Sequence, residues 1–130
     1  MSQEIIDGLR SAYRHFADGD FSAYARLPDD FVLKVAPEMP DAGSYRGAAA
    51  REWLAAWVNS FDRLTLEATQ FIDGGERVAI EVIQRGWFKG SDTPAELRHW
   101  AVVKVRDGSL SRTELFLTRG EALEAAGLSR

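Results

Sequence analysis

Cysteine is absent from all 130 residues of the sequence. Without thiols the chain can form neither a disulfide nor a thiolate metal site, and it has no cysteine nucleophile. Histidine is nearly absent as well: His15 and His99 stand far apart and lack the spacing of metal ligands. We therefore predict neither a metal nor another cofactor. The lack of cysteine also fits a reducing compartment.

An excess of positive charge is missing too. The formal net charge is −4, and acidic and basic residues are interleaved without a basic stripe. Because phosphate binding requires clustered Lys and Arg, we expect no nucleic-acid partner. No stretch approaches the ~20 apolar residues that span a bilayer. Residues 1–7 lack the basic and apolar regions of a secretory signal, so we expect a cytoplasmic protein without a membrane partner.

Several catalytic motifs are also lacking. The sequence has no glycine-rich phosphate loop, no Gly-x-Ser-x-Gly turn and no His-Glu-x-x-His helix. Nucleotide hydrolysis and serine nucleophile chemistry therefore have no support. What remains is an ordinary globular composition, 45% hydrophobic and 28% charged, in a chain the size of one domain. We predict a single domain over residues 1–130.

Helical periodicity dominates the first half of the chain. Ser2 can cap a helix that runs to Ala17, because apolar residues recur there at three- and four-residue steps. A short second helix is predicted over 21–27 and a third over 47–61, and glycine ends a final helix over 120–127. The apolar face of the first helix contains Ile6, Leu9, Tyr13 and Phe16.

Strand patterns and tight turns fill most of the second half. After an early strand over 31–36 and a proline-bearing loop, the alternation predicts strands joined by short turns. Consecutive strands with such turns pair antiparallel, because a parallel crossover needs a dozen or more residues. The order of elements predicts an α+β fold with helices on one face of the sheet. The later strands are predicted over 64–72, 78–89, 97–105 and 110–117.

Four local features carry a resemblance to a known family. They are Gly19-Asp20-Phe21 after the first helix, Tyr45-Arg46-Gly47 before the third, Asp107-Gly108 between the last strands, and the segment 118–128. In order and spacing the chain resembles the nuclear transport factor 2-like superfamily, in its SnoaL-like, polyketide cyclase-like branch. The resemblance implies a cystatin-like cone: a strongly curved antiparallel sheet wrapped around the N-terminal helices, with an internal pocket. It also implies a homodimer formed through the outer sheet face.

Candidate catalytic residues lie on the last two strands. The resemblance implies that the row with His99 and Ala101 faces the cavity. On the last strand, alternation leaves two choices open, either the row with Arg112 and Glu114 or the row with Thr113. If the first row faces inward, Arg112 and Glu114 meet His99, and a buried carboxylate beside a histidine suits proton abstraction. The alternative is that Glu114 pairs with an arginine at a wet edge.

Aromatic side chains are the candidate ligand contacts. Trp53 and Trp57 stand four residues apart on the third helix and either fill the core or wall the pocket. Tyr13 falls about one residue from the position where steroid isomerases of this superfamily place a hydrogen-bonding tyrosine. We expect it to pack in the core with its hydroxyl at the cavity wall. Phe116, on the last strand, completes the predicted ligand-binding set.

The resemblance leaves the function open. The positions of the two catalytic carboxylates of the steroid isomerases correspond to Val35 and Ala101, so we do not expect that mechanism. One hypothesis is a cofactor-independent isomerase, cyclase, lyase or hydrolase that acts on a small apolar or cyclic substrate by general acid/base catalysis. The second is a non-catalytic protein that binds a small apolar molecule. The third is a dimeric interaction domain.

Overall fold

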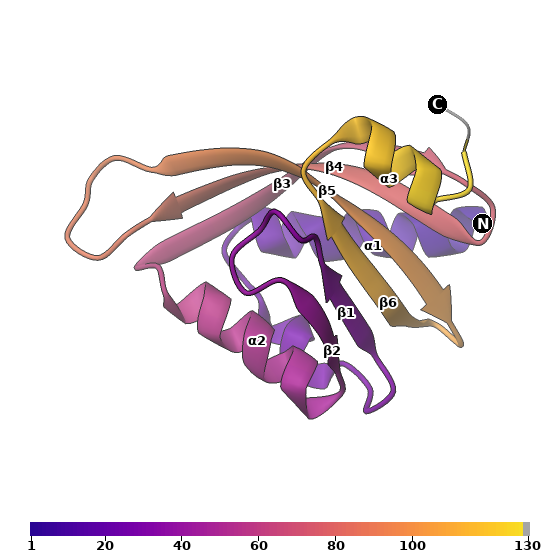
Figure 1. Cartoon of the computed structure of the whole chain (residues 1–130), viewed down its shortest axis with the longest axis horizontal. Helices are drawn as coiled ribbons and strands as arrows, with labels where there is room; N and C mark the ends of the chain where they lie inside the picture. Colours follow the sequence, from indigo (N-terminus) through magenta and orange to yellow (C-terminus); the bar gives the residue numbers. More distant parts are fainter. Residues whose placement is uncertain (129–130) are drawn as a thin grey trace.

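The computed structural model describes residues 1–128. As Figure 1 shows, helices and a single sheet are packed together, which confirms the predicted α+β class. The elements are α1 (Gln3–Ala17), the 3-10 helix η1 (Ser22–Arg26), β1 (Val32–Val35), β2 (Gly43–Arg46), α2 (Ala48–Asn59), β3 (Arg63–Asp73), β4 (Arg77–Trp87), β5 (Ala95–Arg106), β6 (Ser109–Phe116) and α3 (Arg119–Ala125).

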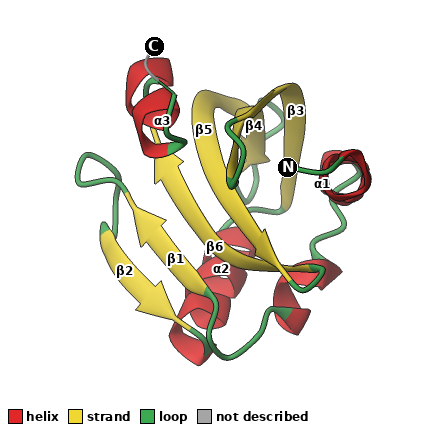
Figure 2. Ribbon diagram, turned by 90° about the vertical axis from the view of Figure 1, so that its right-hand side faces the viewer, coloured by secondary structure: helices red, strands yellow, loops and turns green. Residues whose placement is uncertain are grey.

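The sheet is mixed, where the turns predicted antiparallel pairing. Its six strands run in the order β2-β1-β6-β5-β4-β3. Four of the pairs are antiparallel, and the three among β3, β4, β5 and β6 are the ones that the turns predicted, but β1 lies parallel to β6. The parallel pair joins the first strand to the last, across α2 and four strands, so no short turn constrains its direction. Figure 2 shows that the sheet curves strongly and that its edge strands, β2 and β3, stay apart.

Local contacts explain where α1 begins and ends. The Ser2 hydroxyl accepts a hydrogen bond from the Ile5 N–H at 3.3 Å, which satisfies one of the free donors at the helix start. Ile6, Leu9 and Phe16 are buried on one helix face, as the periodicity predicts. That face packs against the inner side of the sheet, where α1 contacts β3.

The connection into α2 differs from the expected one. Residues 43–46, assigned in the sequence analysis to a loop and the opening of the third helix, form β2 and pair with β1. Gly47 then turns the chain into α2 with a φ of 55°, a conformation that favours glycine. A side chain at Gly47 would also collide with the carbonyl of Asp29. These two constraints place α2 against β2 and η1.

Two apolar clusters lie on opposite faces of the sheet. The larger one lies between the inner face and α1, η1 and α2. Figure 1 shows these helices on that side of the sheet. The smaller one lies on the outer face, where Ala122 of α3 and Ala126, which caps that helix, pack on Ala79, Trp100 and Val102. The sheet is therefore covered on both sides near its middle. Among residues 1–128, no helix is long and apolar enough to cross a membrane.

Candidate functional site

A cavity lies between the inner face of the sheet and the helices that cover it. Its volume is about 530 Å³, within the range of roughly 300–1,000 Å³ typical of small-molecule sites. Most of the lining side chains are apolar, and the only formally charged ones among them, Glu4 and Arg26, are exposed. The apolar lining includes Leu9, Phe16, Leu33, Leu54, Trp57, Leu66, Ala101, Val103 and Leu115.

His99 is the most deeply buried polar side chain of the lining, at 3% exposed. It stands on β5 in the row that continues with Ala101, Val103 and Val105, all of which line the cavity. The orientation expected from the resemblance is therefore the one observed. Within residues 1–128, neither ring nitrogen makes a hydrogen bond of good geometry, although the backbone of Trp100 lies close enough to act on the ring.

The surroundings of His99 keep the imidazole neutral. Burial lowers its pKa to about 4, and the nearby backbone of Trp100 opposes only part of this shift. Because the charged form is disfavoured in an apolar environment, both nitrogens at neutral pH belong to an uncharged ring, one a donor and one an acceptor. Such a ring can donate one hydrogen bond and accept another, or it can accept a proton.

Two tyrosines add hydroxyl groups to the cavity wall. Tyr13 of α1 and Tyr24 of η1 both line it. Burial raises the pKa of both phenols, and for Tyr24 the neighbouring Tyr13 raises it further. Both hydroxyls therefore stay protonated at neutral pH. Phe16 holds the two rings in place, with ring centroids 5.0 Å from Tyr13 and 4.9 Å from Tyr24.

On β6 the row that faces the cavity contains Thr113 and Leu115. The expectation that Arg112 and Glu114 meet His99 inside the cavity is therefore wrong. In the sheet, Leu115 pairs with Ala101 and Glu114 pairs with Val102. Because paired residues point to the same face, the inward row of β5 determines which row of β6 points inward. Arg112 and Glu114 thus project from the outer face, on the opposite side of the sheet from His99.

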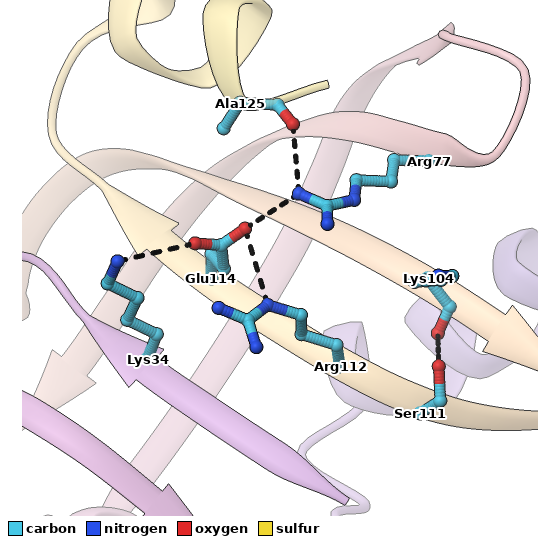
Figure 3. Close-up of polar contacts among 7 residues, drawn as sticks. All are labelled: Lys34, Arg77, Lys104, Ser111, Arg112, Glu114 and Ala125. Carbon is cyan, nitrogen blue, oxygen red and sulfur yellow. Dashed lines mark hydrogen bonds and ion pairs between the residues drawn. The ribbon is translucent and has the colours of Figure 1, made fainter. Parts of the chain in front are cut away.

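Glu114 lies instead in an ion-pair cluster beneath α3 (Figure 3). Its carboxylate is 3.1 Å from the guanidinium of Arg77 and 3.5 Å from Nε of Arg112. Nζ of Lys34 lies 4.0 Å from the other carboxylate oxygen. Arg77 also donates a hydrogen bond to the carbonyl of Ala125 at 3.1 Å, which ties α3 to the sheet. This arrangement matches the alternative in which Glu114 pairs with an arginine. The residue is buried, however, at 6% exposed, and does not lie at a solvated edge.

The remaining predicted ligand contacts divide between cavity and core. Trp57 lines the cavity, whereas Trp53 packs between Trp57 and Tyr45, with centroids 6.0 and 6.1 Å away, and is not part of the lining. The prediction for Phe116 is wrong, because it belongs to the outward row of β6 and packs against the cluster under α3.

Among the polar lining residues, Tyr24 was not a sequence candidate, and Thr113 was named only as part of the alternative inward row. Tyr24 follows Phe21 at a helical step of three, which could have indicated an inward aromatic pair. Thr113 could be found only by knowing which row of the last strand faces inward. The two positions of the missing carboxylates are apolar and buried, with Val35 in the core and Ala101 on the cavity wall. Within residues 1–128, no cluster of side chains has a composition that could hold a metal ion.

A family model described as the SnoaL-like domain matches residues 9–113. This match covers most of the chain. The chain belongs to the SnoaL-like domain family. The matched residues include His99 of β5 and Thr113 of β6, two polar residues of the cavity lining.

Solved structures share the fold of this SnoaL-like domain at low sequence identity. TerC co-crystallised with polyporic acid has a TM-score of 0.70 at 22% identity, covering 95% of this chain and 98% of TerC. The epoxide hydrolase/cyclase-like enzyme SalBIII, with a role in pyran ring formation in salinomycin, has a TM-score of 0.70 at 17% identity, covering 90% and 92%. A protein of unknown function with a cystatin-like fold from Xanthomonas campestris has a TM-score of 0.70 at 20% identity, covering 97% of this chain and 98% of that protein. No curated protein sequence matches the chain.

Proposed function

We propose that this SnoaL-like domain binds a small, mainly apolar, cyclic molecule in its cavity and that His99 is the polar anchor for it. The observation that supports this most is a neutral imidazole with two unpartnered nitrogens inside an apolar enclosure. A buried polar group without a partner costs about 1–3 kcal/mol. A ligand that forms a hydrogen bond with the imidazole recovers part of that cost. Burial of the ligand's apolar surface stabilises the complex further.

The cavity sets the size and character of the ligand. At the packing density of protein interiors, ~0.74, it holds a molecule with a van der Waals volume of up to about 390 Å³. This is enough for several fused or linked rings. The hydroxyls of Tyr13, Tyr24 and Thr113 offer additional hydrogen bonds at the wall. TerC, which shares the fold, was co-crystallised with polyporic acid, and SalBIII is described as acting in the formation of a ring.

The test compares two probe molecules that differ by one hydroxyl, 2-naphthol and naphthalene. Each is titrated into the wild-type protein and into His99→Leu, which keeps a similar side-chain volume and removes both nitrogens. Losing one hydrogen bond should weaken 2-naphthol binding by about tenfold and leave naphthalene binding nearly unchanged. His15→Leu is the matched control, because His15 is exposed on α1 and lies outside the cavity lining.

Two outcomes would contradict the proposal. If His99→Leu weakens both probes equally, His99 is not the polar anchor. If neither these probes nor larger uncharged ring compounds, such as flavanone and a neutral steroid, raise the melting temperature, the cavity is not a ligand site. A ligand at about 100 times its dissociation constant would add about 2.7 kcal/mol of stability, which a melt detects readily.

A second candidate function is proton transfer to and from a bound substrate, with His99 as the base. One observation favours it: no side chain within residues 1–128 occupies either nitrogen, and the ring is unprotonated at neutral pH, although its low pKa makes it a weak base. A proton on a carbon beside a ring carbonyl would move to the imidazole. The protonated hydroxyl of Tyr13 is suited to stabilise the oxygen on which negative charge develops.

This catalytic candidate is tested by hydrogen exchange. The protein is incubated in D₂O with 2-tetralone, and exchange at the carbon beside the carbonyl is followed by NMR. Wild type should accelerate the exchange above buffer, and His99→Leu should abolish the acceleration. Tyr13→Phe should reduce it while leaving naphthalene binding unchanged. Equal exchange with wild type and His99→Leu would exclude His99 as the base.

We also propose that the domain forms a homodimer through the outer face of β3, β4 and β5. Family resemblance supports this, and so does the balanced charge of the face. Arg85 contacts Glu67 and Glu96 at 3.1 and 3.0 Å, and Arg98 contacts Glu81 at 3.4 Å. Light scattering should give twice the mass of the chain, and Arg85→Glu should yield monomers. A wild-type monomer would contradict the proposal.

A further inference from the structure

The register of the sheet assembles a row of basic side chains from distant parts of the sequence. Arg77 pairs with Lys104, Lys104 with Arg112, Arg112 with Val32, and Val32 with Arg46. Directly paired residues point to the same face of a sheet. Neighbouring strands lie about 4.8 Å apart, so the row runs about 19 Å across five strands of the outer face.

Lys34 stands on the same face, two residues along β1 from Val32, and pairs with Glu114. Together Lys34, Arg46, Arg77, Lys104 and Arg112 form what we call the basic row.

The charge of the basic row is not balanced. Glu114 is the only carboxylate within ion-pair distance of Lys34, Arg77 or Arg112 among the described residues. Arg46 and Lys104 form no ion pair with any residue among 1–128. The basic row and Glu114 together therefore have a formal charge of +4. Because the whole chain is −4, the other residues sum to −8.

This surface does not serve the cavity, because it lies on the opposite face of the sheet from His99. It is also unsuited to the centre of a two-fold dimer interface, in which the same patch meets itself and like charges would oppose each other. The alternating charges of Glu67, Arg85 and Glu96 suit such an interface better. The basic row is therefore better suited to binding a partner other than the cavity ligand or a second copy of the chain.

The surrounding charge limits how long that partner can be. Electrostatic attraction extends about 10 Å at 0.1 M salt. A nucleic acid or an anionic membrane would extend past the basic row and meet the repulsion of the remaining −8. A short anionic segment that ends at the row meets mainly the local +4. Arginine and lysine side chains in a row across the strands can also pair with carboxylates spaced along an extended peptide.

We propose that the basic row is a docking surface for a short acidic peptide segment of another protein. Carboxylates of the segment pair with Arg46, Lys104 and Arg112, and Lys34 contributes at the side. Arg112 is well suited because its guanidinium is only partly engaged: Nε faces Glu114 without a hydrogen bond of good geometry. The side chain of Lys34 is 55% exposed and can reach an incoming carboxylate.

The test uses a fluorescein-labelled octaglutamate peptide and fluorescence anisotropy at low salt. Wild type should bind it saturably, and binding should weaken as salt rises. The double variant Arg46→Gln/Lys104→Gln removes two charges that have no ion pair, so the fold should persist. It should weaken binding by about tenfold. Arg63→Gln/Lys89→Gln, which removes the same charge away from the basic row, should change binding by less than about twofold.

Several results would overturn the proposal. One is no saturable binding, and another is an equal loss in both double variants, which would indicate a general charge effect. Tighter binding to a short DNA duplex or to phosphatidylglycerol vesicles than to the peptide would assign the surface to a different partner. Conversion of a dimer to monomers by Arg46→Gln/Lys104→Gln would make the basic row part of the chain's own interface.

Discussion

Burying His99 as a neutral ring makes the stability of this domain depend on pH in a predictable direction. In the unfolded chain the imidazole titrates near its ordinary pKa of 6.5, and in the folded protein burial lowers that pKa to about 4. Between these values the unfolded state binds the proton and the folded state does not. Stability therefore falls as pH decreases through this window, while above pH 6.5 the residue contributes no pH dependence.

The magnitude follows from the size of the shift. Each unit of pKa difference corresponds to about 1.4 kcal/mol, so His99 costs about 3 kcal/mol of folding free energy once the pH is below its folded pKa. His99→Leu cannot bind the proton in either state. As the pH falls from 7.5 to 4, the free energy of unfolding of this variant should therefore rise by about 3 kcal/mol relative to that of wild type.

The assay is urea unfolding of both proteins at a series of pH values. Carboxylates that titrate in acid are the same in the two proteins, so the difference between them isolates His99. Thr113→Val is the control, because this neighbouring polar side chain of the cavity does not titrate. Its difference from wild type should be constant with pH. A constant difference for His99→Leu as well would refute the claim that His99 is buried in a neutral form.

Three further predictions concern the fold around the site. Glu114→Ala should lower the free energy of unfolding by about 3 kcal/mol in urea titrations, since it leaves three cations without their carboxylate, and should not affect naphthalene binding. Gly86→Ala should lower the melting temperature, at a cost of about 1–3 kcal/mol, because the added methyl group collides with the ring of Phe61. Leu33→Ala, at a position 1% exposed, should cost about 2–5 kcal/mol by chemical denaturation, and a value below 1 kcal/mol would contradict close packing there.

Helices and most strands could be predicted because their patterns are local. The period of Ile6, Leu9 and Phe16 and the cap at Ser2 define α1 within the segment itself. The tight turns between the later strands likewise determine their antiparallel order. β2 escaped prediction because its four residues include glycine and serine and its pairing depends on β1.

The inward row of β6 could not be predicted because both faces of that strand are partly covered. Leu115 packs toward the cavity, while Phe116 packs beneath α3, so hydrophobicity distinguishes the two rows poorly. Only pairing with β5 resolves the choice. The basic row could not be predicted from the sequence for a related reason. β1 and β6 are neighbours in space but far apart in sequence. Interleaved charge along the chain therefore did not imply interleaved charge on the sheet.

If His99 meets a ligand inside the cavity, the NMR resonances of its ring nitrogens should report the contact. Long-range ¹⁵N–¹H correlation spectra of the two histidines are recorded before and after 2-naphthol is added. The His99 nitrogens should shift as one of them is engaged by the hydroxyl, while those of exposed His15 stay in place. Saturable binding that leaves the His99 nitrogens unchanged, or that shifts only His15, would contradict it.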